Sequence, residues 1–386
     1  MALPFFNPPS GCTVTPTPFS INIPESSLTE LQTILKYSKL AKPTYENSNS
    51  DKYHGVSREW LEHAKSSWEN TFDWRKSEAY VNNFPQYTMP VVVNGQQPMK
   101  IHFAALFSER KDAVPLLLLH GWPGSFLEFL PMLSLLQQEH TPSNMPYHVI
   151  VPSLPGFAFS DAPPLDREFD LGDVAALMDG LMGNLGFGGG YVAQGGDVGS
   201  KVSRILGAKC ASCKAVHLNY CPVPEPANPI GEVDKIDLEI YERAAEFKAK
   251  SGGYAVEQAT RPSTIGLVLA NPEIDTILEA ISLYWLTDTI PSSVYMYRQR
   301  FESEDKGGAG NPNYYIDKPL GFSAFPQERW PAPKAWAATT GDLGGHFAAL
   351  EQPALLLQDI KDFVAQVWKS VITYWEKSEF GDDCRG

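Results

Sequence analysis

One aspartate lies where a catalytic nucleophile would be expected. Asp197 is the centre of Gly195-Gly196-Asp197-Val198-Gly199, between the β-rich run 190–194 and a helical stretch. Small residues two positions before and after a nucleophile are typical of the strained strand-to-helix turn that presents it above a parallel sheet. A carboxylate in this position can attack carbon and form an enzyme ester. Because Gly-x-Asp-x-Gly is a common string, the prediction depends on its place between a strand and a helix.

A second loop can supply backbone donors to the same site. The buried run 114–120 ends in His120-Gly121-Trp122-Pro123-Gly124. In the strand-turn-helix arrangement above, the oxyanion hole consists of the N–H after the nucleophile and an N–H from a loop of this kind. We therefore predict Trp122 and Val198 as the oxyanion-hole donors. For His120 we favour a structural role, in which its ring binds loop backbone, over acid–base catalysis.

A histidine and an acid complete the predicted triad. The chain order for this arrangement is nucleophile, acid, histidine, and His346 is the only histidine after His217. The acid is expected just beyond a strand that precedes the histidine. Glu328 follows the short predicted strand 321–326 and is the preferred candidate. Asp317 precedes that strand, and Asp342 is too near His346 in sequence.

The elements that must position these residues alternate between strands and helices. Apolar runs predict buried strands at 101–107, 114–120, 147–153, 190–194 and 214–221, with helices at 126–138 and 171–185. This alternation predicts an α/β fold with a mostly parallel central sheet and helices on both faces. The charged turn Ser-Glu-Arg-Lys-Asp at 108–112 predicts a hairpin-like connection between the first two runs. Residues 353–372 predict a final amphipathic helix.

Four segments divide the chain around this core. Residues 1–100 are proline-punctuated with helical spacing and predict an N-terminal helical extension. Residues 101–222 predict the first part of the core. Residues 223–318 begin at a breaker segment and continue with helical patterns, which predicts a helical lid inserted into the core. Residues 319–386 predict the second part of the core.

Composition excludes several classes of protein. The 386 residues are 43% apolar and 20% charged, which argues against disorder. The net charge of −14, with no basic run, argues against nucleic acid as a partner. No apolar stretch reaches the roughly 18 residues of a membrane span, and the N-terminus lacks the positive region of a signal peptide.

The cysteines predict a reducing environment. Five are present, an odd and sparse set for a chain of this length, so we expect a cytoplasmic protein without a disulfide framework. Cys210 and Cys213 have the spacing of a metal or redox pair. A structural zinc site needs about four ligands, and no second pair accompanies them. We therefore expect structural thiols and no metal.

Many stretches resemble the microsomal-type epoxide hydrolases, especially the soluble fungal members, which have the α/β-hydrolase fold. The resemblance extends over nearly the whole chain, and the N-terminal stretches are characteristic of this family and not of α/β-hydrolases at large. The matching stretches are PFSINIPES, FDWRKSEAYVNNFPQYT, IHFAALFSER, HGWPGSFLEF, VPSLPGFAFS, QGGDVGS, RPSTIG, SLYWLTD, GFSAFP and GGHFAALEQP.

The resemblance implies a role for each site residue. Asp197 matches the nucleophile, and His346 with Glu328 matches the pair that activates water. Tyr254 and Tyr297 match two lid tyrosines that donate hydrogen bonds to the epoxide oxygen, with Tyr295 as an alternative to Tyr297. The implied partners are a small apolar epoxide and water, with no cofactor. Fungal relatives imply xenobiotic detoxification, and a homodimer is one assembly that the pattern allows.

Two segments look shorter than the family pattern. The stretch AWAATTGDLGGHF has no strongly apolar run, although a core strand is expected between the acid and the histidine. The stretch from RPSTIG to SLYW lacks an expected lid helix. These gaps support an alternative hypothesis, in which the chain is a catalytically inactive relative that only binds apolar ligands. A haloalkane dehalogenase shares the Asp, His and acid design, but Val198 stands where such enzymes typically have Trp.

Overall fold

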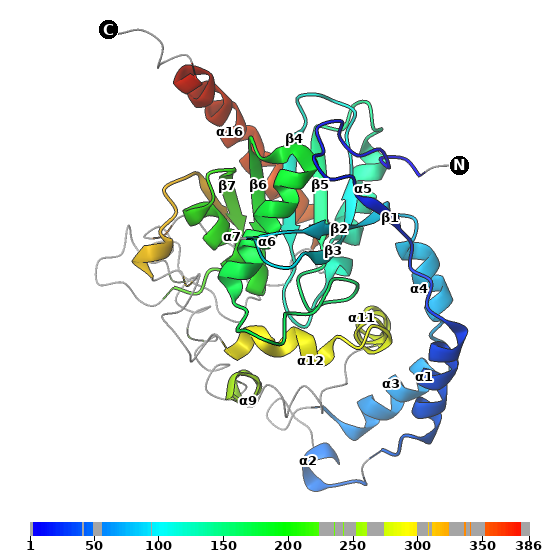
Figure 1. Ribbon diagram of the computed structural model, residues 1–386. Helices are drawn as coiled ribbons and strands as arrows, with labels where there is room; N and C mark the ends of the chain where they lie inside the picture. The colour runs from blue at the N-terminus through cyan, green and yellow to red at the C-terminus, as the bar shows by residue number, and fades with distance from the viewer. Residues whose placement is uncertain are drawn as a thin grey trace, which may run out of the picture.

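The computed structural model describes most of the chain (Figure 1). The described residues are 3–40, 42–48, 56–93, 95–223, 252–260, 274–298, 311–323 and 352–379, together with residues 235, 242, 308, 336 and 340. Within them, eight strands form one sheet in the order β1-β2-β3-β5-β4-β6-β7-β8. The strands are β1 (Thr17–Phe19), β2 (Gln86–Val91), β3 (Met99–Leu106), β4 (Val114–Leu119), β5 (Tyr147–Pro152), β6 (Tyr191–Gly195), β7 (Cys213–Leu218) and β8 (Leu320–Phe322).

The sheet is parallel where the site residues attach to it. Strands β5, β4, β6, β7 and β8 pair in parallel with their neighbours, while β1, β2 and β3 add antiparallel strands at the other end. The five predicted core strands all form, within three residues of their expected bounds. The short strand predicted at 321–326 is represented by β8. The α/β-hydrolase fold class is therefore confirmed.

One local prediction is wrong and another is incomplete. The predicted hairpin between β3 and β4 does not form, because β5 lies between them and pairs with each. Residues 1–100 are also not purely helical, since β1 and β2 belong to the sheet. In β2, only Gln86, Tyr87 and Thr88 pair with β1. Pro90 lies beyond these residues, so the N–H that proline lacks is not needed for a hydrogen bond to β1.

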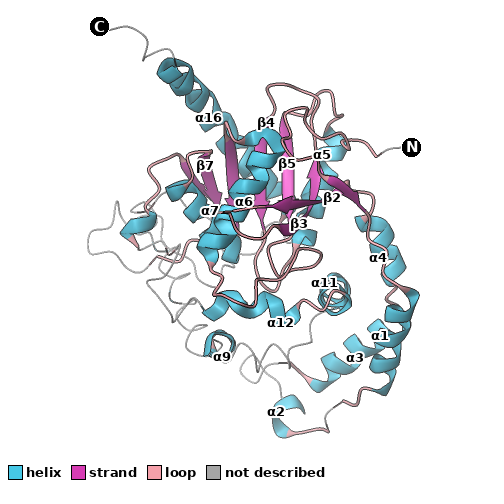
Figure 2. Cartoon of the chain, viewed as in Figure 1, coloured by secondary structure: helices cyan, strands magenta, loops and turns pink. Residues whose placement is uncertain are grey.

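Helices cover both faces of the sheet (Figure 2). One apolar layer contains residues of α6 and α7, and the layer on the opposite face contains residues of α5 and α16. The α-helices are α1 (Glu25–Tyr37), α2 (Tyr45–Ser48), α3 (Arg58–Asn70), α4 (Trp74–Val81), α5 (Leu130–Glu139), α6 (Leu171–Met182), α7 (Asp197–Lys209), α9 (Gly253–Thr260), α11 (Ile274–Leu286), α12 (Ile290–Ser293) and α16 (Pro353–Glu379). Shorter turns are η1 (Phe126–Phe129), η2 (Gly183–Phe187), η3 (Val294–Arg298) and η4 (Pro312–Tyr314).

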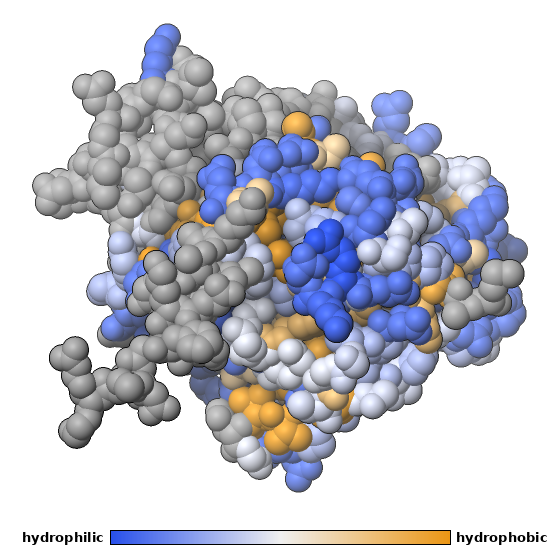
Figure 3. Space-filling view, turned by 90° about the horizontal axis from the view of Figure 1, so that it is seen from above, coloured by the Kyte–Doolittle hydropathy of each residue, from blue (hydrophilic) through white to orange (hydrophobic). Residues whose placement is uncertain are grey.

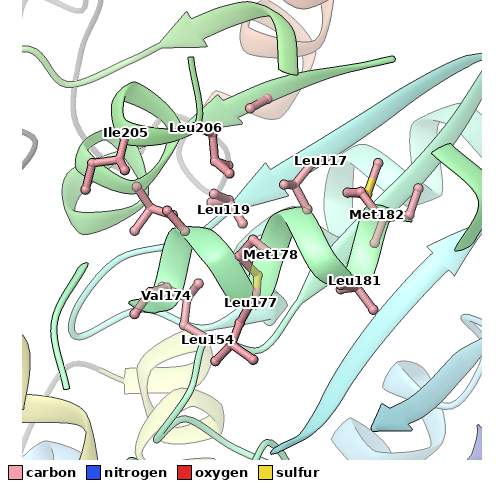
Figure 4. Packing of buried hydrophobic residues seen from close by; sticks show 14 of the residues in the cluster. Leu117, Leu119, Leu154, Val174, Leu177, Met178, Leu181, Met182, Ile205 and Leu206 are labelled. Carbon is pink, nitrogen blue, oxygen red and sulfur yellow. The ribbon is translucent and has the colours of Figure 1, made fainter. Parts of the chain in front are cut away.

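The α6–α7 layer fixes the strand that precedes the site. Leu117 and Leu119 of β4 point into this layer, where they face Met178 of α6 and Leu206 of α7 (Figure 4). All four side chains are at most 1% exposed. Helix α6 begins at Asp170, which closes a capping box with Asp173 and so satisfies the first free N–H groups. The end of β4 is therefore held in a close-packed apolar environment.

The N-terminal helices contact the lid. Leu278 of α11 is completely buried in a small cluster with Leu31 and Leu35 of α1 and Trp68 of α3. The indole N–H of Trp68 also donates to Ser282 Oγ at 3.2 Å. In Figure 1, α1 and α3 lie on the same side of the molecule as α11. The N-terminal extension therefore supports the second half of the lid.

The surface is largely hydrophilic on the face seen from above (Figure 3), with smaller apolar groups between the polar ones. None of the helices in the described ranges is long and apolar enough to cross a lipid bilayer.

A buried histidine links three parts of the sheet. His102 of β3 is completely buried, and its ring nitrogens lie 2.9 Å from Ser153 Oγ and 3.1 Å from Gln86 Oε1. Burial lowers the pKa of His102 to about 3. The folded protein therefore keeps this ring neutral at pH values where the unfolded chain binds a proton, below about 6.5.

This difference predicts a pH-dependent contribution to stability. The free energy of unfolding should fall as the pH decreases from about 6.5 toward 3, because the unfolded state binds one proton more. His102→Gln removes this proton and keeps a polar side chain. We expect the slope of unfolding free energy against pH, measured by urea unfolding between pH 4 and 6, to decrease by up to about 1.4 kcal/mol per pH unit. His63→Gln, at an exposed position, should leave the slope unchanged. If the slope of unfolding free energy against pH in His102→Gln equals that of the wild type, this prediction is wrong.

Candidate active site

Asp197 occupies a strained turn between β6 and α7. Its φ of 45° lies in the left-handed region that non-glycine residues rarely adopt. A Cβ on Gly195 would lie 2.2 Å from the carbonyl oxygen of Gly199, and a Cβ on Gly199 would lie 2.1 Å from that of Leu119. Both distances are too short for any side chain. The structure thus confirms that the two predicted glycines let the backbones approach, and it has the geometry of a nucleophile elbow.

The loop after β4 binds the Asp197 carboxylate directly. The backbone N–H of Trp122 donates to Asp197 Oδ1 at 2.9 Å. A Cβ on Gly121 would lie 2.3 Å from Asp197 Cβ, so only glycine allows this approach. The structure therefore brings together the predicted nucleophile and one predicted oxyanion-hole donor. Val198, the other predicted donor, is the second residue of α7.

His120 has the structural role favoured above. It is completely buried, and burial lowers its pKa to about 4. Its Nε2 accepts from the N–H of Leu154 at 3.1 Å. Its Nδ1 lies 3.0 Å from the carbonyl oxygen of Gly121, to which the neutral ring donates when the proton is on Nδ1. His120 thus holds the start of the Gly121–Gly124 loop against the loop after β5.

The two predicted lid tyrosines lie close to each other, and Tyr297 also lies close to Trp122. The ring centroids of Tyr297 and Trp122 are 5.4 Å apart in an edge-on arrangement, and those of Tyr297 and Tyr254 are 6.4 Å apart. Burial raises the pKa of Tyr297 well above its usual value, and the charge of Asp197 adds to the rise. The Tyr297 phenol therefore stays protonated near the nucleophile, where it can act as a hydrogen-bond donor.

Tyr295 faces a different part of the molecule. Its ring packs on Phe169, and its pKa is raised by burial and then by Asp173 and Asp170, at the start of α6. Its hydroxyl has no hydrogen-bond partner among the described residues. The structure therefore favours Tyr297 over Tyr295 beside Asp197. This distinction depends on contacts distant in sequence.

Tyr284 of α11 also lies near the site, although the sequence did not single it out. Its hydroxyl donates to the carbonyl oxygen of Gly124 at 2.7 Å. Burial raises its pKa, and the charges of Glu128 and Asp197 raise it further. The only signal in the sequence was its place in SLYWLTD, one of the stretches that resemble the family.

His346 and Glu328 lie outside the described residues, as do residues 261–273 of one stretch that looked shortened and all of the other, AWAATTGDLGGHF, except Trp336 and Thr340. Thr340, six residues before His346, is among the described residues and is buried. The guanidinium of Arg204 in α7 donates to the Thr340 carbonyl oxygen at 3.3 Å and lies 3.2 Å from Cys221 Sγ. The segment that leads to His346 therefore contacts the helix that begins with Asp197.

The cysteine pair has the environment of structural thiols. Cys210 and Cys213 are free, and burial raises their pKa values to about 11 and about 12. The thiolate, which binds metals and attacks disulfides, is thus disfavoured. No cluster of His, Cys, Asp or Glu within the described part of the chain could hold a metal ion.

Two family models match the chain. The model described as "Epoxide hydrolase N terminus" matches residues 16–129. The model described as "alpha/beta hydrolase fold" matches residues 114–374. Together they include the N-terminal helices, the elbow and all of the described residues of the predicted lid.

Several proteins that are similar over most of both chains are named as epoxide hydrolases. The structure of the Aspergillus niger epoxide hydrolase is 44% identical with a TM-score of 0.87, covering 95% of this chain and all of that one. A Dothistroma septosporum protein assigned to the epoxide hydrolases is 42% identical, over 92% of this chain and 91% of its own. Epoxide hydrolase 1 of Sus scrofa is 29% identical, over 90% and 88%.

The elbow geometry predicts unequal effects of two glycine substitutions. Gly199→Ala places a methyl group against the rigid backbone of β4, so α7 must shift, and we expect a loss of about 1–3 kcal/mol in unfolding free energy. Gly183→Ala, at the end of α6, meets no atom within 4 Å and should be neutral or slightly stabilising. Urea unfolding measures both. Equal stability of the two variants would contradict the close approach of β4 and α7.

Proposed function

We propose that this chain, which belongs to the epoxide hydrolase family of α/β-hydrolases, opens epoxides to vicinal diols through an ester on Asp197. The observation that carries the proposal is the 2.9 Å hydrogen bond from the Trp122 N–H to Asp197 Oδ1, next to the protonated phenol of Tyr297. A nucleophile, an oxyanion-hole donor and an acid are the groups that epoxide opening through an ester requires.

Ring opening uses Asp197 and the lid phenols. Since Oδ1 accepts the Trp122 N–H, Oδ2 is the atom that attacks the epoxide carbon. The carbon–oxygen bond of the ring breaks, and the alkoxide takes a proton or a strong hydrogen bond from Tyr297 and Tyr254. Burial beside Asp197 keeps Tyr297 protonated at working pH. The product of this step is a hydroxyalkyl ester whose carbonyl oxygen is Oδ1.

Ester hydrolysis uses the residues inferred from sequence. His346, oriented by Glu328, takes a proton from water, which attacks the ester carbonyl carbon of Asp197. The negative charge of the tetrahedral intermediate develops on Oδ1, where the N–H groups of Trp122 and Val198 stabilise it. Collapse breaks the bond between the ester carbonyl carbon and Oδ2, and the departing alkoxide takes the proton from His346 to complete the diol. The proton that remains on the new carboxyl group returns to the phenol that protonated the first alkoxide, which restores the carboxylate. Neither half-reaction needs a metal or a cofactor.

The contact of Thr340 with Arg204 supports this role for His346. Arg204 is seven residues after Asp197 in α7, or roughly 10 Å along the helix. His346 is six residues after Thr340, a reach of up to roughly 20 Å. The connection from Thr340 to His346 is thus long enough to span this distance.

A dehalogenase is the less supported alternative. Halide release needs indole or amide donors that face the leaving group, whereas Tyr297 supplies a phenol beside Asp197. The indole N–H of Trp122 donates to Ser293 Oγ at 3.1 Å and is therefore engaged within the protein. The observations in the described region give no specific support to an inactive relative.

The surroundings of Asp197 support a small apolar epoxide as substrate, because the rings of Trp122 and Tyr297 lie beside it and Tyr254 packs on Tyr297. A cytoplasmic location remains a prediction that rests on cysteine usage. A homodimer and the four-segment division of the chain likewise remain predictions.

The lid phenols provide the test of this function. Styrene oxide hydrolysis should be measurable for the wild type, and the rate constant of ring opening should fall about 10- to 100-fold in Tyr254→Phe or Tyr297→Phe, with a larger loss in the double variant. One remaining phenol still donates to the alkoxide, whereas none leaves its charge unpaired.

Tyr295→Phe is the matched control, because this nearby tyrosine faces α6 and not Asp197. It should retain the wild-type ring-opening rate. If the wild type does not hydrolyse styrene oxide, the hypothesis of a catalytically inactive relative is favoured. If the Tyr254→Phe/Tyr297→Phe double variant is fully active, a group other than these phenols is the acid.

A further inference from the structure

Tyr284 connects the lid to the loop that binds the nucleophile. It is 6% exposed and belongs to α11. Its hydroxyl donates to the Gly124 carbonyl oxygen at 2.7 Å, across 160 positions of sequence. Gly124 ends the loop that begins at Gly121 and contains Trp122. Because burial keeps the Tyr284 phenol protonated, this donor is present at any ordinary pH.

Ser293 holds the same loop by its side chain. It is completely buried at the end of α12, and its Oγ accepts from the indole N–H of Trp122 at 3.1 Å. The neighbouring Ser292 donates to the carbonyl oxygen of Gly156, in the loop after β5, at 2.7 Å. Segment 284–293 therefore meets two core loops through three polar contacts.

We propose that Tyr284 and Ser293 are positioning residues that keep the Trp122 N–H directed at Asp197 Oδ1. The inference rests on the proposed function. Tyr284 fixes the end of the loop through a carbonyl, and Ser293 fixes the indole of the residue whose N–H is the donor. The second half of the lid then does more than cover the substrate, since it also determines the geometry of the oxyanion hole.

The two half-reactions depend on this hydrogen bond to different extents. During ring opening, Asp197 loses its negative charge as the ester forms, so the interaction of Oδ1 with the Trp122 N–H weakens. During ester hydrolysis, negative charge develops on Oδ1, and the same N–H stabilises it. In a variant whose Gly121–Gly124 loop can shift, hydrolysis of the ester should therefore slow more than its formation.

The support of α11 comes from the N-terminal helices. Trp68 of α3 donates to Ser282 Oγ, two residues before Tyr284. Leu278, six residues before Tyr284 in α11, is completely buried against α1 and α3. These contacts keep Tyr284 in register with Gly124.

The experiment measures both rate constants in Tyr284→Phe and in Ser293→Ala. The full chain is mixed rapidly with styrene oxide, quenched in acid and digested, and the alkylated Asp197 peptide is followed by mass spectrometry. We expect the rate constant of ester hydrolysis to fall about 10-fold or more, since removal of a whole oxyanion donor costs about 100- to 1,000-fold. The rate constant of ester formation should change less than about 3-fold.

Tyr191→Phe is the matched control, because its buried hydroxyl donates to Asp179 in α6, at the opposite end of β6 from the elbow. It should leave both rate constants unchanged. If Tyr284→Phe fails to fold, Ser293→Ala carries the test. If the variants form the ester and the ratio of the two rate constants is the same as in the wild type, this inference is wrong, while the proposed function still stands. A wild type that forms no ester would overturn the proposed function as well.

Discussion

The close approach between the end of β4 and the first turn of α7 is the constraint on which the site depends. Gly199 lies against the Leu119 carbonyl and Gly121 lies against Asp197, at distances that no side chain could occupy. This approach places Asp197 at a positive φ and brings the Trp122 N–H to its carboxylate. The apolar layer of α6 and α7 holds β4 from one side. The lid holds the loop after β4 from the other.

Features set by local pattern could be predicted from the sequence. The strands β4 and β6 are apolar runs that end in glycine-containing turns, and the elbow is contiguous in sequence, so Asp197 and Trp122 followed from motif and position. The order of the strands did not follow. Strand β5 separates β3 from β4, and pairing between distant segments leaves no local signal. Strand β2 was missed because Pro90 interrupts its pattern, although β1 does not reach that residue.

The lid contributes through contacts distant in sequence, which is why it was the hardest part to predict. Tyr295 and Tyr297 are two residues apart, yet one faces α6 and the other faces Asp197. Tyr284 lies in a region for which the sequence predicted only a helical pattern, and its role depends on one carbonyl in a loop 160 positions away. Such a pairing becomes visible only when the folded chain brings the two segments together.

The source of the oxygen added to the epoxide tests the account most directly. With enzyme in excess over styrene oxide in water enriched in ¹⁸O, each site turns over once. If Oδ2 of Asp197 attacks the epoxide and water then attacks the ester carbonyl carbon, the diol leaves with an unlabelled oxygen from the enzyme. The label should then appear in the Asp197 carboxylate, as measured by mass spectrometry of its peptide. Label in the diol of this first turnover, with an unlabelled Asp197, would contradict the ester mechanism.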